Sequence, residues 1–309
     1  MTSLRIGTRR SALALAQARA VASALDDAGV ATVLIEVTTR GDLDRSSPLS
    51  RIGGQGIFVG ALRDALLGGD IDVAVHSLKD LPTQSVDGLV VAAVPEREDP
   101  RDVLVARDGL TLATLPPGAR VGTGAPRRLA QLRLRGKDDL ELVEIRGNVD
   151  TRIGKVASGE LDAVVLARAG LGRLERLDEI TETFDPTEFI PSPGQGALAV
   201  ECRNADEGVV RALAGLDHPR TRAAVTAERA VLAALGAGCS APMGAFADVD
   251  AGTDGSTLSL HAVVAAVDGS ASVRLSTSGP LGEAEKLGRD LAAALLAEGA
   301  SRLIEERVT

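Results

Sequence analysis

The chain has 309 residues, enough for two or three domains, and its 45% hydrophobic and 25% charged residues are ordinary for a globular protein. Four phenylalanines are its only aromatic residues, so it lacks the stacking platforms of single-strand nucleic-acid binders. The net charge of −9 argues against a nucleic-acid or anionic-membrane partner. A polyanionic ligand must therefore be held by a local basic cleft.

Residues 1–95 alternate strand and helix patterns. Ser11 is expected to cap a helix from Ala12 to about Asp27, and Gly29 stops it. The core face of this helix is predicted to use Leu13, Ala16, Ala20 and Leu25. Alternating strands and helices indicate an α/β fold with mainly parallel, doubly wound sheets. The other predicted elements here are strands at 4–7, 32–38, 71–75 and 89–94 and a helix at about 57–67.

Two proline-rich crossings, at 96–100 and 190–195, divide the chain. They predict that the chain leaves its first domain and returns to it, so that two domains joined by two segments form a hinge around a cleft. The expected domains are a discontinuous α/β domain 1 (1–95 and 196–216), an α/β domain 2 (101–189) and a small α+β domain 3 (218–309). Domain 2 has predicted strands at 102–106, 120–122, 141–145 and 162–166. Domain 3 has predicted strands at 243–249, 257–267 and 272–278, between a helix at 221–235 and one or two helices from 281 to about 307.

Two predicted strand-to-helix turns in domain 2 each carry a pair of arginines. Arg127 and Arg128 follow the turn of Gly122 and Gly124, and Arg146 and Arg152 flank the next turn. Ligands bind at such carboxyl ends of strands, and the guanidinium fork pairs well with carboxylates and phosphates. The pattern indicates a site for a ligand with several anionic groups. The alternative is that these arginines are solvated or paired with surface acids.

The stretch from Val75 to Pro82 places Ser77, Lys79 and Asp80 at the end of a buried strand. An aspartate beside a lysine in a cleft can move protons or stabilise a developing cation. The alternative is a surface ion pair in a turn that Pro82 closes. His76 is expected to be packed, and the three histidines have no metal-ligand spacing, so zinc chemistry is not expected.

Other small motifs also bear on function. Arg9 and Ser11, at the first strand-to-helix turn, offer donors to an anion, although Ser11 also suits an ordinary helix cap. Cys239 lies in a glycine-rich turn, where a cysteine is accessible and can serve as a covalent attachment point, whereas Cys202 is expected to be packed. The glycines at 53–56 and 194–196 match neither the Walker nor the Rossmann spacing of phosphate-binding loops.

Because residues 1–7 show no signal-peptide pattern and no apolar run is long enough to span a membrane, a cytoplasmic location is expected.

Taken together, the motifs resemble the porphobilinogen deaminase (hydroxymethylbilane synthase) family over nearly the whole chain. Some of these motifs are weak evidence singly, but their order and spacing are highly specific. The motifs are Arg5-Ile-Gly-Thr-Arg-Arg-Ser-Ala-Leu-Ala-Leu, Thr39-Arg-Gly-Asp, Val75-His-Ser-Leu-Lys-Asp-Leu-Pro, Val121-Gly-Thr-Gly-Ala-Pro-Arg-Arg, Arg146-Gly-Asn-Val-Asp-Thr-Arg, Leu166-Ala-Arg-Ala-Gly-Leu-Gly-Arg, Gly194-Gln-Gly-Ala and Gly238-Cys.

The resemblance implies a transferase of tetrapyrrole and heme biosynthesis. Such an enzyme condenses four porphobilinogen molecules, releases ammonia from each, and hydrolyses the product free as hydroxymethylbilane. The resemblance also implies a dipyrromethane cofactor bound by a thioether to Cys239, no metal, a monomer, and two domains like those of periplasmic binding proteins.

The resemblance further implies the roles of individual residues. Asp80 matches the catalytic aspartate. The cofactor-binding positions are Cys239, Lys79, Ser11, Ser77, Arg127, Arg128, Arg146 and Gly147, and the substrate-binding positions are Arg9, Arg146, Arg152 and Arg173.

The chain departs from the family in the loop of residues 44–56, which the resemblance makes an active-site lid. Gln55 and Gly60 stand where many members carry lysine, although Arg51 keeps one positive charge nearby. The main rival hypothesis is a non-catalytic two-domain binding protein for a polycarboxylate ligand. That rival has no use for Cys239 or for a third domain.

Overall fold

The protein was analysed as a computed structural model that describes residues 3–38, 57–136, 139–236, 241–249 and 256–305. The chain forms two compact units, residues 1–98 with 197–222 and residues 99–196 with 223–309. The second unit contains two separate sheets. The division into three domains stays a prediction.

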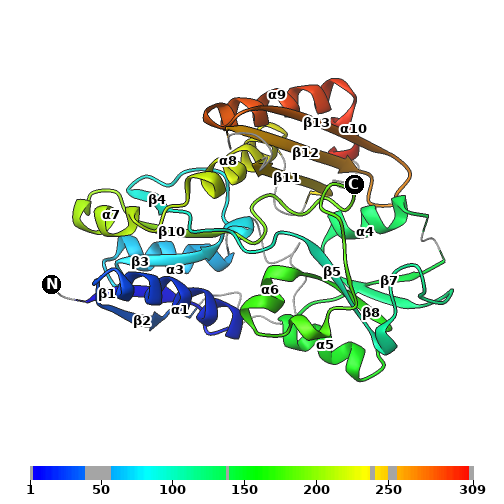
Figure 1. Cartoon of the computed structure of the whole chain (residues 1–309), viewed down its shortest axis with the longest axis horizontal. Coiled ribbons are helices and arrows are strands. Elements are labelled where there is room, and N and C mark those ends of the chain that lie inside the picture. The colour runs from blue at the N-terminus through cyan, green and yellow to red at the C-terminus, as the bar shows by residue number, and fades with distance from the viewer. Residues whose placement is uncertain (1–2, 39–56, 137–138, 237–240, 250–255, 306–309) are drawn as a thin grey trace. The chain divides into compact units, whose positions relative to one another are not determined.

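The first unit is built on a five-stranded sheet of order β2-β1-β3-β10-β4 (Figure 1). Strand β1 pairs in parallel with β2 and β3, whereas β10 runs antiparallel to β3 and β4. Apolar side chains of α1 and α7 pack on one face of the sheet, and those of α3 pack on the other. The strands are β1 (Leu4–Thr8), β2 (Thr32–Glu36), β3 (Val73–Ser77), β4 (Leu89–Ala93) and β10 (Leu198–Arg203), and the helices are α1 (Ala12–Asp27), α3 (Ile57–Leu67) and α7 (Glu207–Ala214).

The second unit begins with a sheet of the same design, in the order β7-β6-β8-β5-β9. Strand β6 pairs in parallel with β7 and β8, and β5 runs antiparallel to β8 and β9. Side chains of α4 pack on one face, and those of α5 and α6 pack on the other. The strands are β5 (Asp102–Ala106), β6 (Arg120–Thr123), β7 (Glu141–Glu144), β8 (Ala163–Ala167) and β9 (Glu182–Thr183), and the helices are α4 (Pro126–Leu134), α5 (Val149–Ala157) and α6 (Arg168–Arg173).

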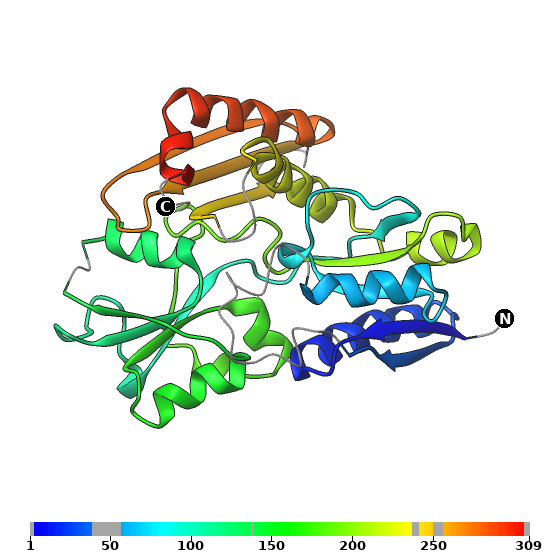
Figure 2. The same cartoon turned by 180° about the vertical axis from the view of Figure 1, so that it is seen from behind.

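The same unit also holds a three-stranded antiparallel sheet of order β11-β12-β13, drawn in orange tones with its red helix in Figure 2. Apolar residues from one face of β12, among them Leu258 and Leu260, pack against Val231 of α8 and Leu291 of α9. The predicted C-terminal helical segment is two helices, separated at Gly299, which has a φ of +93°. These elements are β11 (Met243–Val249), β12 (Thr257–Ala265), β13 (Ser272–Pro280), α8 (Pro219–Ala234), α9 (Ala284–Ala297) and α10 (Ala300–Glu305).

The α/β class predicted from the sequence is confirmed, and the two five-stranded sheets are mainly parallel, because four strands of each run in one direction. One strand in each sheet, β10 in the first and β5 in the second, runs antiparallel to both of its neighbours. Each enters its sheet directly from a crossing segment, without the helical crossover that a parallel neighbour requires. Hydrophobic pattern alone does not distinguish these directions, because both strands are buried on both faces and read as apolar runs.

Candidate active site

In the first unit, two strand ends carry the predicted polar residues. Because β1 and β3 are parallel neighbours, the segments after them leave the same edge of the sheet. Ser11 caps α1, as predicted, through a 3.3 Å hydrogen bond from the Ala14 amide. Gln17, buried in α1, donates a 2.8 Å hydrogen bond from Nε2 to Oγ of Ser77 at the end of β3. This bond fastens the helix that follows β1 to the end of β3.

The turn after β3 is a short 3₁₀ helix, η1 (Leu78–Asp80), anchored by the buried Leu78. The Leu78 amide donates a 3.0 Å hydrogen bond to the carbonyl of Ala197. Lys79 is half-buried and the side chain of Asp80 is exposed. A carboxylate in such an exposed position is accessible to a substrate.

His76 is packed beneath this turn, as the sequence predicted. Its Nε2 lies 3.2 Å from Oε2 of Glu201 in β10. Arg63 of α3 donates to both oxygens of the same carboxylate, with Nη2 2.8 Å from Oε1. Burial alone would raise the pKa of Glu201, but His76 and Arg63 outweigh it and hold this pKa below its usual value. This buried network joins α3, β3 and β10.

In the second unit, the two arginine-bearing turns lie side by side because β6 and β7 are parallel neighbours. The backbone of Gly124 approaches that of Ile145 closely. A Cβ at Gly124 would lie 2.5 Å from the carbonyl oxygen of Ile145 and 3.9 Å from Nη2 of Arg152. After the first of these turns, α4 begins at Pro126. After the second, the side chain of Asn148 caps α5 by accepting a 2.8 Å hydrogen bond from the Thr151 amide.

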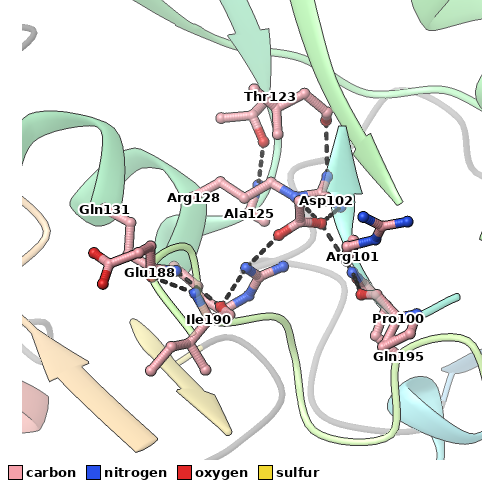
Figure 3. Close-up of polar contacts among 12 residues, drawn as sticks. Pro100, Arg101, Asp102, Thr123, Ala125, Arg128, Gln131, Glu188, Ile190 and Gln195 are labelled. Atoms are coloured by element: carbon pink, nitrogen blue, oxygen red, sulfur yellow. Dashed lines mark hydrogen bonds and ion pairs between the residues drawn. The ribbon is translucent and has the colours of Figure 1, made fainter. Parts of the chain in front are cut away.

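The arginines of the first turn are not solvated, and both pair with Asp102, which is fully buried at the start of β5 (Figure 3). Arg127 donates from Nη1 to Oδ2 at 2.6 Å and to the Ile190 carbonyl at 2.8 Å. Arg128 donates to Oδ1 from Nε at 3.1 Å and from Nη2 at 2.7 Å. Burial lowers the pKa of Arg127 although Asp102 opposes the shift, and the two arginines together keep the pKa of Asp102 below its usual range against its burial. The cluster of these three side chains carries a net positive charge.

The second turn carries Arg146 and Arg152. Arg152 is half-buried and donates a 2.9 Å hydrogen bond from Nε to the Gly147 carbonyl. Burial, followed by the charge of Arg128, lowers the pKa of Arg152 to about 10. Among the described residues no carboxylate forms an ion pair with Arg152. Arg146 is also half-buried, and Gly147 has a φ of +110°, a conformation that favours glycine.

Arg173, near the end of α6, donates a 2.7 Å hydrogen bond from Nη2 to the carbonyl of Gly196. This bond fastens it to Gly196, directly after the second crossing. Arg9 is half-buried in the first unit. Cys239 and the loop of residues 44–56, with Arg51 and Gln55, lie outside the described residues. Cys202 is packed in β10, as predicted, and burial raises the pKa of its thiol to about 11.

The sequence reasoning missed Asp102, which belongs to this cluster, and Gln195, which donates to it. Gln195 donates 2.9 Å to Oδ1 of Asp102 and 2.7 Å to the carbonyl of Pro100. A signal was present for Asp102, because an acidic residue that opens an otherwise apolar strand must find a cationic partner. Gln195 gave no such signal, because a glutamine between glycines is ordinary in a turn.

Comparisons with known proteins agree with the motifs. Residues 4–211 match the family described as porphobilinogen deaminase, dipyromethane cofactor binding domain, and residues 222–297 match its C-terminal domain. The chain belongs to the porphobilinogen deaminase family. Porphobilinogen deaminase 1 of Streptomyces coelicolor is 58% identical, with 99% of this chain and 98% of that protein covered. The porphobilinogen deaminase of Thermobifida fusca is 54% identical over 99% of this chain and 97% of its own length.

Among solved structures, the methionine-binding protein MetQ is similar over 69% of this chain and 89% of its own, with 14% identity and a TM-score of 0.44.

Membership of the porphobilinogen deaminase family makes the chain a hydroxymethylbilane synthase, a transferase of tetrapyrrole biosynthesis with a dipyrromethane cofactor. The rival hypothesis of a non-catalytic binding protein is not favoured. In the described part of the chain no helix has the length and apolarity to cross a membrane, and no three metal-ligating side chains are grouped.

Proposed function

We propose that the arginines of the two turns in the second unit hold the acetate and propionate groups of the dipyrromethane and of the growing pyrrole chain, and that Asp80 assists the chemistry. Each porphobilinogen brings two carboxylates, so anionic charge accumulates as units are added. Arginine suits this task because its planar fork pairs with carboxylates and keeps its charge at neutral pH.

The observation that carries this proposal is the environment of Arg152. Its guanidinium is half-buried beside another cation, Arg128, and no described carboxylate pairs with it. Burying an unpaired charge is unfavourable, and a ligand carboxylate would offset that cost. The residues present therefore fit a polycarboxylate such as dipyrromethane. Arg127, Arg128, Arg146, Arg152 and Gly147 would surround its acidic groups in this unit.

Ser11, Ser77 and Lys79 are proposed to bind cofactor or substrate in the first unit, as is Arg9. The hydrogen bond from Gln17 to Ser77 and the capping role of Ser11 hold two of these side chains in place. When bound, the dipyrromethane supplies the free pyrrole carbon to which new units are joined. Asp80 is proposed to stabilise the positive charge that develops on porphobilinogen as ammonia departs, and to accept a proton from the pyrrole system.

The test of this proposal is Arg152→Leu, with Arg120→Leu as matched control. Arg120 starts β6 at the end remote from the turns and pairs with Glu141 at the surface, 3.6 Å away. Apo-protein is incubated with porphobilinogen, and intact mass reports the added pyrrole units. We expect Arg152→Leu to acquire the cofactor at least about tenfold more slowly, because one buried charge-assisted contact is worth about 1.5–3 kcal/mol. Acquisition at the parent's rate by Arg152→Leu would contradict the proposal.

Porphobilinogen is the substrate that the family implies. A monomeric state and a cytoplasmic location are also proposed, and neither follows from the fold. Light scattering of the purified protein tests the first, and fractionation of cells that express it tests the second. A stable dimer or a membrane-associated fraction would contradict the respective proposal.

A further inference from the structure

The cluster formed by Asp102, Arg127 and Arg128 is built more tightly than a pair of ligand-binding arginines requires. All three residues are nearly inaccessible, with exposed fractions of 0%, 4% and 5% respectively. Asp102 accepts from both guanidinium groups, and each guanidinium also has a second, backbone anchor. Arg127 donates to the Ile190 carbonyl, and Arg128 donates from Nη1 to the Val165 carbonyl at 2.8 Å.

Neighbouring amides hold the same framework. Gln131, one turn further along α4, donates to the Ile190 carbonyl at 2.9 Å and accepts from the Ile190 amide at 2.7 Å. Gln195 holds the carboxylate itself and bridges it to the Pro100 carbonyl. The side chain of Asp102 is therefore restrained from both crossing segments. Figure 3 shows Gln195 beside Asp102, and Gln131 beside Ile190.

We propose that Asp102 is a positioning residue for ligand carboxylates: it fixes the guanidinium groups of Arg127 and Arg128 and cancels one of their two charges. This inference rests on the proposed function of the arginine turns. Long arginine side chains that are already ordered lose less rotational freedom when a ligand binds. Cancelling one charge leaves a single net positive charge, which matches one ligand carboxylate and disfavours retention of small inorganic anions.

The counter-charge and the geometry can be separated with two substitutions. Asp102→Asn keeps the shape and removes the charge, whereas Asp102→Glu keeps the charge and displaces it. Asp162→Asn is the matched control, because Asp162 in the same unit pairs with Arg107 at 2.6 Å and accepts from the Arg120 amide, remote from α4. Each apo-variant is incubated with a series of porphobilinogen concentrations, and intact mass gives the fraction that acquires dipyrromethane. Circular dichroism and Tm report folding.

We expect Asp102→Asn to need about tenfold more porphobilinogen for half-loading, because a displaced guanidinium loses contacts in the loaded state. Sulfate is the second readout. Loading of Asp102→Asn should be inhibited at several-fold lower sulfate concentration, because the pair then carries two net charges. Asp102→Glu should keep the parent's sulfate sensitivity while loading poorly. The Asp162→Asn control should lose stability without any change in loading or in sulfate sensitivity. This comparison distinguishes a positioning role of Asp102 from a contribution to stability alone.

Two further variants keep every outcome informative. If Asp102→Asn does not fold, Gln195→Met, which cannot donate to the carboxylate, should raise the half-loading concentration about threefold. Parent-like loading and sulfate response by a folded Asp102→Asn, or by Gln195→Met where Asp102→Asn is unfolded, would overturn the inference. Arg127→Gln tests the underlying function separately. If Arg127→Gln loads normally, the proposed role of the arginine pair fails; if only the Asp102 series loads normally, the positioning role alone fails.

Discussion

Two aspartates of this chain, Asp80 and Asp102, have opposite surroundings. Asp80 is exposed at the end of a short 3₁₀ turn, whereas Asp102 is buried and bonded to two arginines and a glutamine. A carboxylate that already accepts four charged or amide N–H contacts has little capacity left for proton transfer. Asp80 therefore suits the chemical step and Asp102 suits the placement of other groups.

The role of Asp80 can be tested with Asp80→Asn. Because the side chain is exposed, the free energy of unfolding should change by no more than about 0.5 kcal/mol. Turnover should fall at least about a hundredfold, since the amide neither accepts a proton nor stabilises a cation as a carboxylate does. Turnover is measured as porphobilinogen consumption and ammonia release, on protein whose cofactor content is checked by mass spectrometry. Asp87→Asn, at another exposed aspartate, is the control. Turnover of Asp80→Asn within twofold of the parent would refute the proposed role of Asp80 in the chemical step.

At the scale of elements, the parallel pair β6 and β7 brings the two arginine turns together, and Gly124 makes the close approach possible. Gly124→Ala should destabilise the protein by about 1–3 kcal/mol, because the new methyl group would meet the Ile145 carbonyl at 2.5 Å. Gly154→Ala is the control. Gly154 lies exposed in α5 with open space around its Cβ position, so alanine there should stabilise by up to about 1 kcal/mol. Urea unfolding measures the free energy of unfolding of both variants. If Gly124→Ala is as stable as Gly154→Ala, the steric argument is contradicted.

The junction of α3, β3 and β10 depends on the ionised carboxylate of Glu201. Because its pKa is below the usual 4.5, the stability that it contributes is present above that pH and is lost as pH falls through the lowered value. Glu201→Gln should lose about 3 kcal/mol at pH 7 by leaving Arg63 without its buried counter-charge. The variant should also show a shallower decline of stability below pH 5.

Urea titrations between pH 3 and pH 7 measure this pH dependence. The control is Glu207→Gln, whose exposed pair with Arg211 in α7 contributes no more than about 1 kcal/mol. If Glu201→Gln matches the parent at pH 7, or declines with the same slope below pH 5, the network does not stabilise the junction as argued.

The sequence predicted the position of most elements, and physical reasons explain where it did not. The helix α3 and the strand β11 have their predicted bounds. The buried face of α1 was wrong at Ala20, which is exposed, while Ala18 and the polar Gln17 are buried. An alanine-rich helix has a weak hydrophobic contrast, so its inward face depends on the neighbour that it meets, here Ser77.

In the candidate site, too, some features could be predicted from the sequence and others could not. Turn glycines and the arginines after them could be predicted, because strand-to-helix turns have local sequence signatures. That Arg127 and Arg128 pair with Asp102 depends on a strand 25 and 26 residues away in sequence. No local pattern encodes such a distant pair; only the antiparallel placement of β5 beside β8 brings it about.

At the scale of the whole molecule, the chemistry requires one covalent anchor, and the chain has two cysteines. Cys202 is fully buried in β10, and burial, then the charge of Asp206, raise the pKa of its thiol to about 11. A buried, protonated thiol is a poor nucleophile. Cys239, in the predicted glycine-rich turn and outside the described residues, is therefore the proposed attachment point.

Intact mass spectrometry of the parent, Cys239→Ser and Cys202→Ala tests this assignment. The parent and Cys202→Ala should carry an added mass equal to two linked pyrrole units, and Cys239→Ser should have its bare sequence mass, because serine forms no thioether. A parent found at bare mass is incubated with porphobilinogen, from which an apo-enzyme builds the cofactor on its own thiol. No added mass after that incubation, or an adduct that persists in Cys239→Ser, would show that the covalent anchor is absent or lies elsewhere.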